Sequence, residues 1–66
     1  MNKITVIFTD AINTWEMELT KEEIEIISEF KPILDGNSGE KSYRIVDLRF
    51  NLDSGNFTFF IDEEPA

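Results

Sequence analysis

Hydrophobic and polar residues alternate along four segments of the chain, and a period of two is typical of a β-strand with one buried face. β-Branched and aromatic residues are frequent in these segments, which also favours strands because such side chains pack well on a pleated surface. The predicted strands cover residues 3–10, 14–19, 43–52 and 57–62.

The same alternation predicts which side of each strand faces the core. Positions two apart lie on the same face of a sheet, so the more apolar set of each strand is expected to be buried. In chain order, the inward sets are Ile4, Val6 and Phe8; Trp15, Met17 and Leu19; Val46, Leu48, Phe50 and Leu52; and Phe57, Phe59 and Ile61.

A helix is predicted between the second and third strands, beginning after Thr20. Thr20 and Glu23 fit a capping box, in which each side chain bonds the backbone N–H of the other residue. The apolar residues that follow recur with helical spacing, and Ile24 is placed toward the core. The helix is expected to end at Phe30 or Lys31 because Pro32 disfavours helical geometry in the residue before it.

Turn-forming residues separate the predicted elements. Residues 10–13 and 53–56 are expected to form tight turns, since Asp, Asn and Gly are enriched there. Residues 35–42 contain two glycines and no apolar residue before Tyr43, so they are interpreted as a flexible loop. Residues 63–66 are interpreted as a solvated tail, and the whole span 1–66 as one domain.

The order of elements is β-β-α-β-β, which predicts a small α+β domain with one helix packed on one face of a four-stranded mixed sheet. The first and last strands carry Ile7 and Phe60 even on their outer faces. This favours a central position for both and the strand order 2-1-4-3, with the first and last strands parallel. Such an arrangement resembles the β-grasp architecture of ubiquitin-like domains and of the immunoglobulin-binding domain of protein G. The alternative is a fully antiparallel meander.

Composition excludes several kinds of chemistry. The 66-residue chain has no cysteine and no histidine, so it lacks disulfides, thiolate metal sites and the usual general base. The segment from Gly36 to Ser42 departs from the phosphate-loop spacing, and the residues from Asp47 to Asn56 lack the calcium-loop spacing. No catalytic residue, cofactor or metal ion is therefore predicted, and the chain is not expected to be an enzyme.

The sequence shows neither the pattern of a secretory leader nor a long apolar run. The chain is therefore expected to be cytoplasmic. Its formal net charge is −8, which repels nucleic acid and anionic lipid, so we expect no direct binding to nucleic acid and none to membranes. If charge selects a partner, that partner is a protein with a basic surface.

Acidic residues are concentrated on the predicted helix and on the outer face of the sheet. Glu25 and Glu29 are four residues apart and repel each other, and only Lys21 is spaced to relieve Glu25. We therefore predict a small, non-enzymatic, acidic protein-binding module, such as an inhibitor of the phage or mobile-element type that imitates the charge of nucleic acid. The acidic contacts predicted for this partner are Glu16, Glu18, Glu22, Glu25, Glu29 and Asp62.

The sheet face opposite the helix offers a second surface. The predicted alternation places Ile7, Tyr43, Ile45 and Phe60 there, and contiguous apolar patches often mark interaction sites. Tyr43, Ile45 and Phe60 are accordingly included among the predicted partner contacts. Two alternatives remain for the function: a homodimer that buries this open face, or an acidic domain whose charge serves only solubility.

Overall fold

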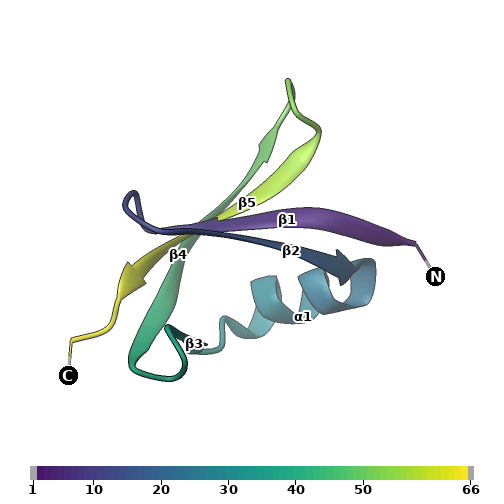
Figure 1. Cartoon of the computed structure of the whole chain (residues 1–66). Helices are drawn as coiled ribbons and strands as arrows, with labels where there is room; N and C mark the ends of the chain where they lie inside the picture. The colour runs from purple at the N-terminus through teal and green to yellow at the C-terminus, as the bar shows by residue number, and fades with distance from the viewer. Residues whose placement is uncertain (1, 66) are drawn as a thin grey trace.

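The computed structural model describes residues 2–65, which form one helix and five strands (Figure 1). The helix matches the predicted position, and the four predicted strands are present with slightly different ends. The elements are β1 (Lys3–Thr9), β2 (Thr14–Thr20), α1 (Lys21–Phe30), β3 (Leu34–Gly36), β4 (Lys41–Asn51) and β5 (Asn56–Glu63).

The strands form one curled sheet in the order β2-β1-β5-β4-β3. β1 and β5 are parallel, whereas all other neighbours are antiparallel, so the predicted parallel pairing of the first and last long strands is confirmed. The prediction of four strands is wrong, because Leu34–Gly36 pairs with the start of β4 and adds a fifth. A segment of three residues is too short to show the alternation typical of a strand. It forms a strand because it pairs with β4.

The predicted flexible loop at residues 35–42 is largely replaced by this β3–β4 hairpin. Only residues 37–40 form the turn, which is closed by hydrogen bonds from Gly39 N–H to Gly36 C=O (3.1 Å) and from Glu40 N–H to Asn37 C=O (3.1 Å). The predicted tail is also shorter, because Glu63 belongs to β5 and Glu64 N–H donates to Ser42 C=O at 2.7 Å. Residue 66 lies outside the described residues.

The helix begins with the predicted capping box. Glu23 N–H donates to Thr20 Oγ1 (3.2 Å), and Thr20 N–H donates to Glu23 Oε1 (2.8 Å). The bond from Thr20 N–H also lowers the pKa of Glu23, because it favours the charged carboxylate. At the other end, Lys31 adopts the left-handed conformation (φ 48°), and its N–H donates to Ile27 C=O at 2.9 Å.

A β-bulge in β4 reverses the predicted faces of its first half. The register passes from Ile45 opposite Ile61 to Asp47 opposite Phe60, so Val46 is an extra residue without a partner. One extra residue moves every side chain on one side of it to the other face. Tyr43 and Ile45 therefore join the core side of the sheet, and their predicted place on the open face is wrong; Val46 is 53% exposed instead of buried.

The core lies between the helix and the concave side of the sheet. Its central contact is the stack of Phe8 on Phe59, with ring centroids 5.0 Å apart, which joins the parallel strands β1 and β5. Ile24 is the buried residue of the helix. The buried core residues are Val6, Phe8, Leu19, Ile24, Tyr43, Phe59 and Ile61.

The helix covers only part of the sheet. Figure 1 shows α1 beneath β1 and β2, while the turn between β4 and β5 projects away from it. Phe30 on the helix is 71% exposed, and Leu52 at that turn is 88% exposed. Within residues 2–65, no helix combines the length and the apolar character that crossing a membrane requires.

The β1–β2 turn is organised by the Asp10 carboxylate. Its Oδ1 atom accepts hydrogen bonds from Asn13 N–H (2.6 Å) and Ile12 N–H (3.0 Å). These bonds, that from Asn13 first, lower the pKa of Asp10 below its ordinary value of 3.8 because they favour the ionised form. The stability of this turn therefore depends on the ionisation of the Asp10 carboxyl group.

We expect a pH-dependent contribution of Asp10 to stability. Because the folded-state pKa is lowered, this contribution is present above pH 3.8 and is lost as the pH falls through the lowered value. An NMR titration of the Asp10 carboxyl carbon should therefore give a pKa below 3.8. The difference in unfolding free energy between the natural chain and Asp10→Ala should shrink over the same acid range. A titration at or above the ordinary value would contradict this expectation.

Candidate functional site

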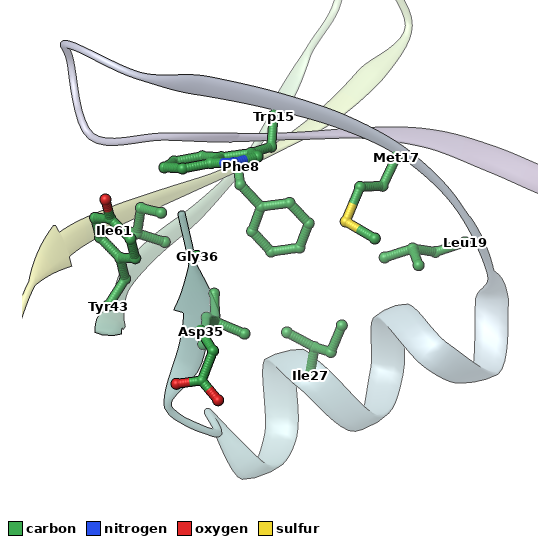
Figure 2. Close-up of a pocket in the computed structure, with 10 residues that line it drawn as sticks. Phe8, Trp15, Met17, Leu19, Ile27, Asp35, Gly36, Tyr43 and Ile61 are labelled. Carbon is green, nitrogen blue, oxygen red and sulfur yellow. The ribbon is translucent and has the colours of Figure 1, made fainter. Parts of the chain in front are cut away.

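An apolar cavity lies between the helix and the curled sheet (Figure 2). Its volume is about 260 Å³, and nearly all the surface around it is apolar. The helix and each of the five strands contribute residues to its lining, but the part of the β4–β5 hairpin near its turn does not. The lining residues are Phe8, Trp15, Met17, Leu19, Ile27, Leu34, Asp35, Gly36, Tyr43 and Ile61.

The curl of the sheet creates this cavity by bringing its two edges toward each other. Trp15 of β2 meets Tyr43 of β4 edge to face, with ring centroids 5.2 Å apart, although the two strands are not neighbours in the sheet. Gly36 of β3 permits this approach. A Cβ atom there would lie 3.0 Å from Tyr43 Cε2 and 3.4 Å from Trp15 Cζ2, so a larger residue would displace one of the rings.

Tyr43 and Asp35 contribute the side-chain oxygen atoms in the lining of the cavity. The hydroxyl of Tyr43 is buried and has no hydrogen-bond partner among residues 2–65. The carboxylate of Asp35 is exposed, accepts a hydrogen bond from the Ser42 hydroxyl (3.1 Å), and points away from Phe8 and Trp15 in Figure 2. The cavity is therefore suited to apolar groups, and it brings no acid and base together for catalysis.

The predicted acidic residues of the helix are all exposed. Glu25 lies 3.9 Å from Lys21, which is the spacing expected from the sequence. In the described part of the chain, Glu22 and Glu29 have no cation within ion-pair distance. The helix thus carries two acidic groups that neither cap it nor pair with a neighbour.

The predicted acidic residues of the sheet fall into two groups. Asp62 on β5 lies 3.9 Å from Arg44, so its charge has a counter-charge nearby. Glu16 and Glu18 on the edge strand β2 are exposed and, across residues 2–65, form no ion pair. Among the predicted acidic contacts of the sheet, the two without a counter-charge therefore lie on the edge strand β2.

Three of the six lysines and arginines lie on one strand at the other end of the sheet. Lys41, Arg44 and Arg49 all lie on β4, where they pair with Glu63 (3.3 Å), Asp62 (3.9 Å) and Asp47 (2.9 Å) respectively. The Glu63 carboxylate raises the pKa of Lys41, and the Arg49 guanidinium lowers that of Asp47. Positive and negative charges consequently balance on β4 and β5, whereas β2 and α1 each carry an excess of negative charge.

The open face is less apolar than predicted. Ile7 and Phe60 lie there. The bulge moves Tyr43 and Ile45 to the core side and exposes Val46 near Phe60 in their place. The guanidinium of Arg49 lies 5.4 Å from the centroid of the Phe60 ring and shields part of it. Sequence reasoning also missed the cavity, because no pattern in the chain reveals how far a sheet curls.

Metal-binding geometry is not found in the described residues: within 2–65, no group of three or more acidic side chains is arranged to hold an ion. The chain matches no protein-family model, no curated protein and no solved structure. The geometry and charge of its own residues therefore carry the functional argument.

Proposed function

We propose that this protein is a small acidic binding module, without catalytic activity, that docks on the basic surface of another protein. One observation carries the proposal. Within residues 2–65, two exposed glutamates on β2 (Glu16 and Glu18) and two on α1 (Glu22 and Glu29) have no counter-charge, whereas four of the six lysines and arginines already pair with other acidic residues. Exposed like charges that do not pair within the chain attract a partner of opposite charge and speed its association.

Imitation of nucleic acid is the form of this function that we favour. A protein that binds nucleic acid presents lysines and arginines spaced to neutralise phosphates. Carboxylates held on a rigid helix offer such a surface an alternative set of negative charges, and the module inhibits by occupying it. The helix acids Glu22, Glu25 and Glu29 lie on the outward side of α1, where they are open to contact.

The open sheet face supports self-association less well than the sequence suggested. Two of the four apolar residues predicted for that face are in the core, and Arg49 covers part of a third, Phe60. The homodimer through this face stays a prediction, but the apolar surface that motivated it is reduced. A module directed at a basic partner accounts for more of the exposed surface.

The test is capture of a partner from a lysate of the cells that make the protein, using the immobilised chain at low and at high salt. We expect a basic protein that binds at low salt and is released by high salt, because screening weakens attraction between exposed charges. Changing Glu22, Glu25 and Glu29 together to lysine should abolish most of the capture.

A matched variant controls for net charge. Changing Glu40, Asp53 and Glu64 to lysine alters the charge by the same amount, but two of these residues lie in turns and one follows β5. This variant should retain the partner, and both variants should unfold at temperatures near that of the natural chain. Equal loss in both would show that only net charge matters. Capture of no basic protein at either salt concentration would contradict the proposal.

A further inference from the structure

The outer edge of β2 has unpaired backbone groups. β2 is the terminal strand of the sheet, and in the described residues it pairs only with β1. Hydrogen-bonded and non-bonded pairs alternate along an antiparallel ladder. The bond from Asp10 N–H to Asn13 C=O at the turn sets the phase of this alternation. Counting from it, the backbone groups of Glu16 and Glu18 point away from β1, toward solvent.

The helix cap supports this assignment independently. Thr20 follows Glu18 by two residues and Glu16 by four, so its backbone N–H should point to the same side as theirs, away from β1. That N–H is indeed free to donate to the Glu23 carboxylate, at 2.8 Å. The free edge of β2 therefore offers the N–H and C=O groups of Glu16 and Glu18 to an additional strand.

The edge lacks most of the features that keep strands from pairing with other chains. β2 contains no proline, and its register with β1 runs without a bulge from Thr14 to Thr20. It is protected by the charge of Glu16 and Glu18 and, near its start, by the packing of Trp15 against Tyr43 and Gly36. Two such edges would bring glutamates together, so this charge opposes pairing with a second copy while favouring a basic strand.

The apolar cavity opens beside this edge. Figure 2 shows Met17 and Leu19 of β2 above the cavity and Ile27 of the helix below it. Met17 is 48% exposed, so it lies at the opening. Ligand pockets usually enclose roughly 300–1,000 Å³. A volume of about 260 Å³ is below that range and suits the side chains of a bound peptide better than a whole small molecule.

From these features we infer that β2 binds an extended segment of the basic partner as a sixth strand of the sheet, an inference that rests on the proposed function. Side chains alternate along such a strand. Those on the helix side are apolar and enter the cavity beside Met17 and Ile27. Those on the opposite side are lysine or arginine and lie near Glu16 and Glu18. Backbone pairing supplies affinity, and the alternation supplies specificity.

The experiment follows backbone hydrogen exchange by NMR in the full chain, with a synthetic peptide in which lysine and valine alternate. The peptide should slow exchange of the Glu16 and Glu18 amides about tenfold, because these N–H groups become hydrogen-bonded. The amides of Trp15, Met17 and Leu19 already bond β1 and should change little. A peptide of the same sequence with N-methylated valines and lysines cannot pair and should give no protection.

Three results would overturn the inference. One is unchanged exchange at Glu16 and Glu18 when the peptide is in large excess. Another is equally tight binding of the N-methylated peptide, which would mean that charge alone attracts it. The third is protection that grows with protein concentration in the absence of peptide, which would make a second copy the occupant of the edge.

Two variants separate this inference from the proposed function. Changing Glu16 and Glu18 to lysine should weaken binding of the lysine–valine peptide, whereas changing Glu22, Glu25 and Glu29 to lysine should affect it less. If the cellular partner is lost only with the helix variant, the docking function stands and the added strand is wrong. If the peptide protects the edge but no basic partner is captured, the edge site stands and the proposed function is wrong.

Discussion

Replacing Phe59 with alanine is expected to remove a large part of the protein's stability. Phe59 is fully buried on β5, and its ring stacks on Phe8 at 5.0 Å. Truncating a buried phenylalanine usually costs about 3–5 kcal/mol, because the lost contacts leave a cavity. At the usual stability per residue, a domain of 66 residues has roughly 3–10 kcal/mol in total. The midpoint of denaturant unfolding should therefore fall sharply or disappear.

The next residue along β5 provides a matched control. Phe60 points to the open face, is 38% exposed, and contacts the Arg49 guanidinium. Phe60→Ala removes the same atoms from the neighbouring position, yet it should cost only about 1 kcal/mol, near the usual cost of a point substitution. Similar losses in both variants would contradict the assignment of the two faces of β5.

Tyr43→Ala should be almost as damaging as Phe59→Ala. Simple alternation along β4 places Tyr43 on the open face, where truncation would cost little. In the structure the ring is 1% exposed and packs against Trp15, so the expected loss is about 3–5 kcal/mol of unfolding free energy. Chemical denaturation followed by circular dichroism measures this difference directly.

Tyr43→Phe separates the ring from its hydroxyl. Within the described residues the hydroxyl is buried without a hydrogen-bond partner, and burying an unpaired polar group is unfavourable. Removing it while keeping the ring should raise the unfolding free energy by about 1 kcal/mol. A large loss in this variant would show that the hydroxyl makes a stabilising hydrogen bond.

The uneven distribution of charge also bears on the binding surface that we propose. The cations of β4 pair with acids of β4 and β5, so the charges on these two strands cancel. The edge of β2 and the outward side of α1 keep uncompensated glutamates. Exposure and the lack of an internal counter-charge are the properties on which the proposed docking to a basic partner rests.

The amino-acid sequence by itself determined the local features of this protein. Thr20 and Glu23 form the predicted capping box, and the helix occupies Lys21–Phe30 as expected. The alternation correctly assigned the inward residues of β1 and β5, and the outer apolar residues Ile7 and Phe60 correctly indicated a central parallel pair. These features depend on neighbouring residues or on a regular period, which the sequence displays directly.

Only the tertiary structure decided the bulge, the fifth strand and the cavity. Val46 forms a bulge because β5 pairs with the residues on both sides of it. The resulting shift in register places Tyr43 in the core. Leu34–Gly36 becomes a strand because β4 extends beside it. The cavity exists because the curled sheet brings Trp15 close to Gly36 and Tyr43. Each of these outcomes depends on contacts between residues far apart in the chain, and a local pattern contains no information about such contacts.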